Sequence, residues 1–293
     1  MNELDFIEQR VDLENKLKIY TGIDRVILAE EKKIELEEAR LTKPLFSART
    51  QIPGLDECVD GFRRGQLVVV SGPPKQGKTL LCQNFTKRFT EQKLRCLWFS
   101  YEVGYEELFE KFPMELLDFY IPNQLQSGNL EWIETKIIES KVKYATDVVF
   151  IDHLDFLRDT RILSGVSFNL SSYIGGIVQK LKSIAIEQNI LTFLMSHIRK
   201  NQWTTNDLPS SEELRDSGQI AQLADIVIMI VRRRAEKGTQ SVYEGTRALV
   251  GVIENRLNGR TKKIPIELRG KEFVEITNVY DAEGNDQNAG NIW

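Results

Sequence analysis

The chain has 293 residues, of which 41% are hydrophobic and 28% charged, a composition that excludes global disorder and favours a folded α/β protein with an appendage. No apolar run approaches the ~18 residues that a membrane span needs, so we expect a cytoplasmic protein, in the host cytoplasm if the source is viral. The net charge of −4 excludes a broadly basic surface, and any nucleic-acid site must therefore be local.

The first predicted elements are two amphipathic helices, over residues 4–20 and 24–40, where Glu, Lys, Leu and Ile recur at helical spacing. Pro44 stops the second helix. We therefore assign residues 1–45 to a helical N-terminal arm or linker. Two interpretations stay open, because the helices either cap the main domain as a solvated hairpin or dock their apolar stripe on a neighbouring subunit.

Short apolar runs alternate with helical stretches from residue 50 onward, which is typical of a mainly parallel sheet flanked by helices. The expected buried strands are residues 67–71, 96–100, 148–152, 191–196 and 226–231. Three later runs favour antiparallel additions at the sheet edge and cover residues 248–254, 263–268 and 273–276. We expect this α/β core to occupy residues 46–280 and the polar residues 281–293 to form a flexible tail.

The segment SGPPKQGKT, residues 71–79, follows the first expected strand and fits the phosphate-loop pattern G-x-x-x-x-G-K-[ST]. Backbone N–H groups of such a turn converge on phosphate oxygens at a helix N-terminus, where the helix dipole also favours negative charge. Lys78 is expected to reach the terminal phosphates and Thr79 to ligate Mg²⁺. The residues predicted to bind the nucleotide in this loop are Gly72, Pro73, Pro74, Lys75, Gln76, Gly77, Lys78 and Thr79.

Polar side chains stand at or just after the ends of the next expected strands, where ligands of open parallel sheets gather. Asp152 ends the third strand and is placed to hold Mg²⁺ opposite Thr79, so it belongs to the predicted nucleotide and metal site. Glu102 follows the second strand and is placed to orient and polarise an attacking water. Two further side chains, which we interpret as loop or packing residues, are His153 and Asp155.

Six segments of the chain carry a family resemblance: TQIPGLDECVDGFRRGQLVVVSGPPKQGKT, LWFSYE, DVVFIDHLDFL, LTFLMSHIRK, ELRDSGQIAQLADIVIMI and IENRLNGRT. Their order and approximate spacing resemble the RecA-like ATPase core of DnaB-type replicative hexameric DNA helicases, over residues 50–276. The most telling piece is LRDSG, residues 214–218, followed by IAQLAD. It resembles the helicase segment that contacts single-stranded DNA and then enters the next core strand.

The resemblance implies ATP and Mg²⁺ as cofactors and gives the matching residues their roles. Lys78 and Thr79 correspond to the phosphate and metal ligands. Glu102 corresponds to the catalytic base, and Asp152 to the second metal carboxylate. His197 stands where the family has a Gln or His that senses the terminal phosphate and signals towards the DNA loops.

Arg256 corresponds to the arginine that the family projects into the neighbouring subunit's active site. A guanidinium suits this role because it stays charged and offers several donors to the transferring phosphoryl group. The chain departs from the family at Glu254, where a lysine usually stands. Either a nearby cation such as Arg260 substitutes for that lysine, or hydrolysis in trans is weaker than usual.

The nucleic-acid contacts are expected from two loops, residues 155–172 and 199–218. In the LRDSG segment, backbone N–H groups and the Arg215 cation would hold the strand without reading its bases. The residues predicted to bind DNA are Arg158, Arg199, Arg215, Asp216 and Gly218. Arg158, Arg161 and Lys200 are each either a phosphate contact or a solvated side chain. Trp203 either stacks on a base or packs its loop.

The resemblance implies an ATP-dependent replicative DNA helicase that translocates on single-stranded DNA as a homo-oligomeric, hexameric ring. Its expected partners are single-stranded DNA, a primase, a loader and a single-strand-binding protein. With only about fifty residues before the core, a compact form of phage or plasmid origin is expected. The alternatives are a RecA-like recombination or repair ATPase, and a non-translocating, ATP-gated helicase loader or regulatory assembly.

Overall fold

Contacts divide the chain into two compact units, Met1–Phe46 and Ser47–Trp293. In this computed structural model, the described residues are 3–22, 25–42, 46–113, 115, 117–158, 170–198, 208–209, 218–232 and 246–276. The predicted tail, residues 281–293, lies outside these ranges. None of the helices within them combines the length and the apolar character needed to cross a membrane.

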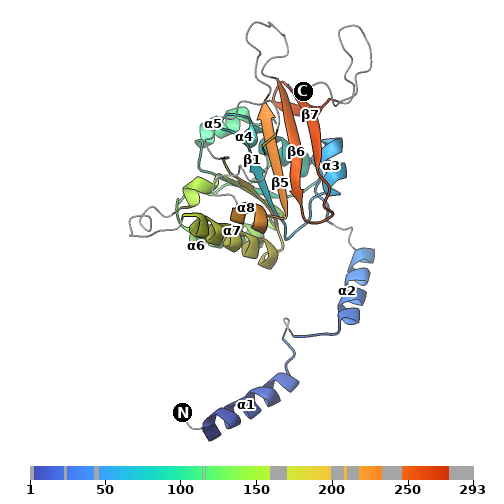
Figure 1. The fold of residues 1–293 in the computed structure, drawn as a ribbon, viewed down its shortest axis with the longest axis vertical. Coiled ribbons are helices and arrows are strands. Elements are labelled where there is room, and N and C mark those ends of the chain that lie inside the picture. The colour runs from blue at the N-terminus through green and yellow to red at the C-terminus, as the bar shows by residue number, and fades with distance from the viewer. Residues whose placement is uncertain are drawn as a thin grey trace. The chain divides into compact units, whose positions relative to one another are not determined.

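The described part of the first unit contains helices α1 (Glu3–Lys18) and α2 (Ala29–Thr42), drawn in blue in Figure 1. Both predicted helices are present, but α2 begins at Ala29 rather than at residue 24. Acidic residues in its first turn, Glu30 and Glu31, favour this start because carboxylates stabilise a helix N-terminus. Apolar side chains of both helices, such as Leu17 and Ile34, are exposed. Docking on a neighbouring subunit therefore stays a prediction.

Within the described residues, the second unit is built on an eight-stranded sheet with the order β2-β3-β4-β1-β5-β6-β7-β8 (Figure 1). The strands are β1 (Leu67–Ser71), β2 (Cys96–Ser100), β3 (Val148–Asp152), β4 (Leu191–Met195), β5 (Ile226–Arg232), β6 (Arg247–Asn255), β7 (Lys262–Arg269) and β8 (Glu272–Glu275). The first five strands in the order pair in parallel, and the last three are added antiparallel. The predicted mainly parallel sheet with an antiparallel edge is confirmed.

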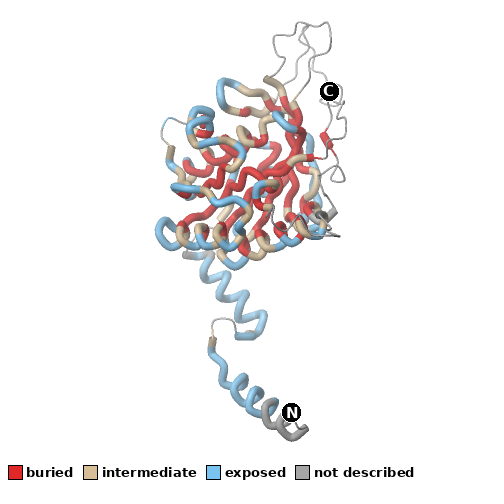
Figure 2. Tube along the Cα trace, turned by 90° about the vertical axis from the view of Figure 1, so that its left-hand side faces the viewer, coloured by how far each residue is buried: buried red, intermediate tan, exposed pale blue. Residues whose placement is uncertain are grey.

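Helices cover both faces of this sheet. They are α3 (Pro53–Val59), α4 (Lys78–Glu91), α5 (Tyr105–Lys111), α6 (Leu130–Tyr144), α7 (Leu170–Glu187) and α8 (Gly218–Leu223), with a 3₁₀ turn, η1 (Leu154–Leu157), after β3. On the α4 face, the rings of Phe85 and Phe89 lie 5.8 Å from that of Phe193. On the other face, Leu194 packs in one core cluster with Val178 of α7. Burial on both faces, seen as the red centre of Figure 2, explains why the central strands are continuous apolar runs.

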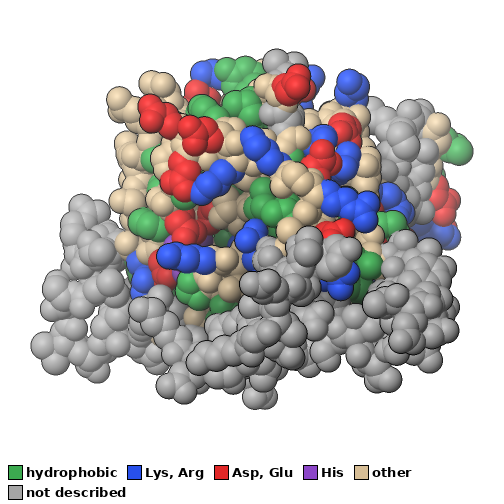
Figure 3. Space-filling model, turned by 90° about the horizontal axis from the view of Figure 1, so that it is seen from above, with side chains coloured by type: hydrophobic (Ala, Val, Ile, Leu, Met, Phe, Trp, Pro, Cys, Tyr) green, Lys and Arg blue, Asp and Glu red, His purple; other side chains and the backbone are tan. Residues whose placement is uncertain are grey.

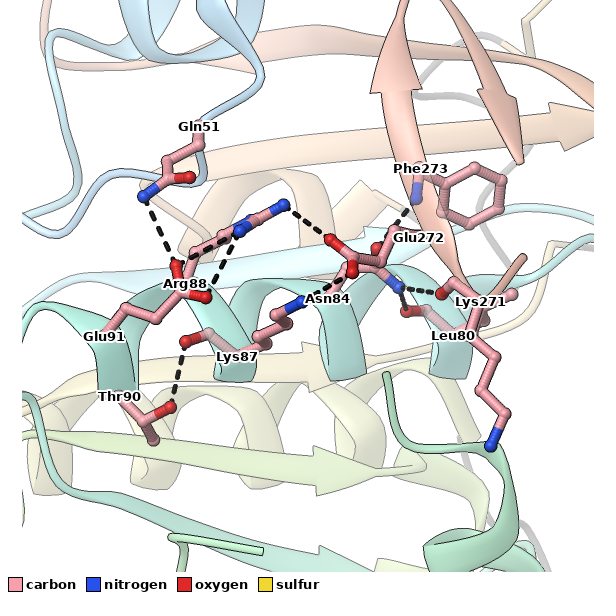
Figure 4. A network of polar contacts seen from close by, with 10 residues as sticks. All are labelled: Gln51, Leu80, Asn84, Lys87, Arg88, Thr90, Glu91, Lys271, Glu272 and Phe273. Atoms are coloured by element: carbon pink, nitrogen blue, oxygen red, sulfur yellow. Dashed lines mark hydrogen bonds and ion pairs between the residues drawn. The ribbon is translucent and has the colours of Figure 1, made fainter. Parts of the chain in front are cut away.

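Helix α4 is tied to the turn between β7 and β8 by a polar network (Figure 4). The Asn84 amide donates to the carbonyl oxygen of Lys271 at 3.0 Å and accepts from the backbone N–H of Phe273 at 2.7 Å. Between these two residues, the Glu272 carboxylate pairs with Lys87 and Arg88. The network therefore fixes the antiparallel hairpin beside the helix that begins at the phosphate loop.

Replacing Asn84 with alanine is expected to destabilise the folded chain by about 1–3 kcal/mol, because a buried N–H and a carbonyl lose their partner. Denaturant unfolding of the variant measures this loss. Lys87→Ala, in the same helix and facing the same hairpin, is the matched control and is expected to cost less than about 1 kcal/mol, since its ion pair is partly exposed. Equal losses for the two variants would contradict the role given to Asn84.

Candidate active site

The phosphate loop connects β1 to α4 and takes backbone conformations that suit glycine. Gly77 caps the N-terminus of α4 with a φ of 96°, and Gly72 has a φ of 149°. A Cβ added at Gly72 would lie 2.2 Å from the carbonyl oxygen of Ile230 in β5, so a larger residue does not fit there. Gln76 ties the loop to the end of β5, because its side-chain oxygen accepts from the backbone N–H of Arg232 at 2.6 Å. The result is a rigid turn at a helix N-terminus, which suits an anion.

Lys78 is buried in this loop and has only neutral partners there. Its Nζ donates to the carbonyl oxygens of Gly72 at 3.2 Å and Pro73 at 3.0 Å. Burial lowers the pKa of Lys78 to about 8, although the charges of Glu102 and Asp152 oppose the shift. A phosphate in the loop would give this ammonium an anionic partner and offset its desolvation. The geometry of Lys78 therefore fits a phosphate ligand.

Thr79 and Asp152 come together as the sequence predicts. The Thr79 hydroxyl donates to Oδ2 of Asp152 at 2.7 Å. Asp152 is fully buried, and its second oxygen, Oδ1, has no hydrogen-bond partner among the described residues. Burial raises the pKa of this carboxyl to about 7. A hydroxyl and an under-compensated carboxylate side by side are the oxygen donors that Mg²⁺ prefers, so the residues fit this cation.

Glu102, His153 and His197 meet beside this pair. Oε2 of Glu102 lies 4.0 Å from Nε2 of His153, and the two imidazole rings have centroids 4.3 Å apart at 70°. Burial, followed by the charge of Lys78, lowers the pKa of His197 to about 4, so this ring is neutral at pH 7. The interpretation of His153 as a loop or packing residue misses this contact. Its place directly after Asp152, at the carboxyl end of β3, is the signal that points to it.

A cavity of about 580 Å³ adjoins the phosphate loop and reaches residues far away in the sequence. Its lining includes Glu102, Lys111 of α5, Arg232 at the end of β5, and Lys271 in the turn that Asn84 anchors. Nε of Arg232 is buried and has no hydrogen-bond partner among the described residues. No sequence motif points to Arg232 or Lys271, because tertiary structure alone brings them to the phosphate loop: Arg232 ends β5, which pairs in parallel with β1, and Lys271 lies in the antiparallel β7–β8 turn. The cavity has the size and chemistry of a nucleotide site.

Figure 3 looks down on the face towards which β5 points in Figure 1. On the described part of this face, Lys and Arg side chains are interspersed with Asp and Glu side chains. This distribution agrees with the expectation that positive charge is local and not spread over a broad basic surface.

Arg256 lies at the opposite end of the central strands from the phosphate cradle, the site formed by the phosphate loop with Lys78, Thr79 and Asp152. Its backbone N–H donates to the carbonyl oxygen of Asp225, the residue just before β5, at 2.9 Å. The seven residues of β5 separate this point from the strand's carboxyl end, a span of roughly 20 Å. The Arg256 side chain is exposed, and no ion pair or hydrogen bond to it is found in the described part of the chain. Arg256 is therefore not part of the cradle of its own chain.

The predicted DNA-binding residues are only partly within the described ranges. Arg158 follows η1, where its guanidinium pairs with the Asp155 carboxylate at 2.6 Å. Gly218 begins α8. The other predicted positions lie outside the described residues, and these are Arg161, Arg199, Lys200, Trp203, Arg215 and Asp216.

Comparison with known proteins decides the family. The model of the DnaB-like helicase C terminal domain matches residues 48–140 and 113–276. The chain belongs to this family. A probable replicative DNA helicase of Trieres chinensis is 26% identical over 261 residues, which are 77% of this chain and 56% of the relative. The chain thus spans little more than half the length of that curated relative.

Solved structures agree on the fold. One of them, an ATPase domain, matches with a TM-score of 0.69 and 19% identity, over 85% of this chain and 99% of that domain. A DnaB-like replicative helicase, solved in a study of its interactions with primase, matches with a TM-score of 0.66 and 19% identity, over 91% of this chain and 71% of that one. The predicted RecA-like core of a DnaB-type helicase is confirmed.

Proposed function

We propose that this chain is an ATP-dependent replicative DNA helicase that translocates on single-stranded DNA as a hexameric ring. One observation carries the proposal: the chain combines a complete phosphate cradle at one end of its central strands with Arg256 at the other end. An active site that needs this arginine forms only where two subunits meet. Membership of the DnaB-like family supports the same arrangement.

The residues around the cradle have distinct tasks in this proposal. Lys78 binds the terminal phosphates, and Thr79 and Asp152 hold Mg²⁺, which when bound neutralises charge on the phosphates. Glu102 accepts a proton from the attacking water. His197 is neutral at pH 7, so it can hydrogen-bond to the terminal phosphate and respond when that phosphate leaves.

His197 also connects the nucleotide site with the proposed DNA loop. It lies just after β4, and the loop of residues 199–218 begins two residues later. A change in the hydrogen bond of His197 on hydrolysis would therefore be passed directly to a segment proposed to hold DNA. We also propose primase, a loader and a single-strand-binding protein as partners; the study of a DnaB-like helicase with primase supports the first of them.

Strand displacement on forked duplexes, together with electron microscopy of the ATP-analogue complex, tests the proposal. A helicase forms closed rings, hydrolyses ATP faster with single-stranded DNA and unwinds forks with one tail polarity. Filaments that also bind duplex would indicate a recombination or repair ATPase. Oligomers that ignore DNA would indicate a loader or regulatory assembly, and either result would contradict the proposal.

The DNA contact is tested by Arg215→Ala, which is expected to weaken single-stranded DNA binding on every sequence and to reduce its salt dependence, because one phosphate contact is lost. Fluorescence anisotropy at several salt concentrations measures both effects. Arg269→Ala is the control, since this side chain is 67% exposed on β7 and pairs with Glu267. If intact Arg215→Ala rings bind DNA as the parent does, the main support for a contact in LRDSG is lost.

A further inference from the structure

Both histidines of the chain lie in the active site. The whole sequence contains two, His153 and His197, and the fold brings their rings to a centroid distance of 4.3 Å. Together with Glu102 they offer three ligand atoms that all lie within 4.8 Å of one another. His153 is buried, His197 is half-buried, and the Glu102 side chain is 39% exposed. The cluster is therefore partly enclosed and open to solvent on the carboxylate side.

We propose that Glu102, His153 and His197 form a transition-metal site with Zn²⁺ as its matching ion. Imidazole nitrogens suit Zn²⁺, whereas Mg²⁺ prefers the oxygen donors of the Thr79–Asp152 pair, so the two cations are sorted by ligand type. Two imidazoles and one carboxylate are a known ligand set for zinc with an open fourth position. Ligand atoms in such a tetrahedral site stand about 3.4 Å apart. The three side chains, whose ligand atoms lie within 4.8 Å of one another, therefore draw closer together when the metal binds.

Asp155 orients His153 for this role. Nδ1 of His153 accepts from the backbone N–H of Asp155 at 3.2 Å and lies 3.7 Å from its carboxylate Oδ2, which leaves Nε2 facing Glu102. When a metal binds Nε2, the ring proton moves to Nδ1, which then no longer accepts from the Asp155 backbone N–H and donates a hydrogen bond to Oδ2 of Asp155 instead. Arg158 holds the other oxygen of this carboxylate at 2.6 Å. A carboxylate behind the ligand histidine is the common support of zinc-binding imidazoles.

Zinc at this position would take Glu102 away from the attacking water, a consequence that rests on the proposed function. Hydrolysis of ATP would then be inhibited while the phosphate loop itself stays available for nucleotide. Metal binding does not depend on this consequence, because all three ligands come from the geometry of the chain without nucleotide.

Co²⁺ titration of the full chain without nucleotide tests the site. We expect one Co²⁺ per chain with a visible ligand-field spectrum, displaced by Zn²⁺. The buried thiols of Cys58, Cys82 and Cys96 are excluded as ligands if no thiolate charge-transfer band accompanies it. In the zinc complex, the ring signals of both histidines should shift in the NMR spectrum, and with two histidines in the sequence their assignment is simple.

Variants decide which side chains bind the metal. His153→Ala and His197→Gln should each weaken Co²⁺ binding at least tenfold, and Asp155→Asn about tenfold through loss of orientation. Asp60→Asn, an exposed carboxylate on the same unit, should leave it unchanged. Thermal melts show whether each variant is folded. If a variant does not fold, the shift of the histidine ring signals of the parent chain on Zn²⁺ binding decides whether that histidine is a ligand.

Three results would each overturn the site. They are a Co²⁺ affinity that does not change in folded histidine variants, a thiolate charge-transfer band, and histidine ring signals that do not shift when Zn²⁺ is added. Failure of the proposed function looks different: the metal-free chain would not hydrolyse ATP, whatever its metal affinity. If the metal-free chain hydrolyses ATP and Zn²⁺ does not reach the histidines, the zinc site alone is wrong.

Discussion

Glu102→Gln is expected to bind ATP like the parent chain and to hydrolyse it on the order of a hundredfold more slowly, or worse. Glutamine keeps the size and polarity of the side chain beside His153, but it cannot accept the proton of the attacking water. Single-turnover hydrolysis and the equilibrium binding of a fluorescent ATP analogue measure the two quantities separately. Turnover near the parent rate would show that Glu102 is not the base.

Lys78→Ala is the counterpart, because it should lose tight nucleotide binding. The Lys78 ammonium is buried between two loop carbonyls, and a phosphate is the anionic partner that this position lacks. The contrast between the variants is the test: one binds without turnover, and the other does not bind. If both lost binding equally, Glu102 would serve the fold of the cradle and not the chemistry.

Arg256→Ala has the second large expected effect. The variant should bind ATP through its own intact cradle, since Arg256 lies at the other end of the central strands. It should hydrolyse ATP about a thousandfold more slowly, because the neighbouring subunit's arginine no longer stabilises the transferring phosphoryl group. Steady-state ATPase rates at saturating nucleotide measure the loss. Arg260→Ala is the matched control in the same exposed turn. A small effect is expected there, unless Arg260 replaces the family lysine at Glu254.

A loss of nucleotide binding in Arg256→Ala would contradict the geometry, because no part of this side chain reaches its own phosphate loop. Equal losses in the two arginine variants would assign part of the charge to Arg260. That outcome would explain how the chain tolerates Glu254, an acidic residue on β6 opposite Val227, at the position where the family usually has a lysine.

The sheet could be predicted closely because its strands are buried on both faces. Such strands read as continuous apolar runs, and the expected ranges for β1, β2 and β3 coincide with the observed ones. Their carboxyl ends then place Asp152 beside Thr79, since parallel strands end at one edge. The local pattern and the tertiary position carry the same information in this part of the chain.

Other parts of the site depend on contacts that no local pattern encodes. Lys271 reaches the cavity only because Asn84 anchors the β7–β8 turn, and Arg232 only because β5 pairs beside the phosphate-loop strand. His153 is adjacent in sequence to a predicted ligand, but its contact with His197 requires β3 and β4 to be neighbours. A histidine after an apolar strand is otherwise more often a packing residue.

The shared active site is the central claim, and mixing two inactive variants tests it most directly. Rings assembled from Lys78→Ala and Arg256→Ala subunits contain some interfaces in which an intact cradle meets an intact Arg256. If the arginine acts in trans, a fraction of the ATPase activity returns on mixing, and DNA unwinding recovers less because a ring motor needs most of its sites. No regained hydrolysis at any ratio, with co-assembly demonstrated, would contradict the account and leave Arg256 serving its own subunit or the fold.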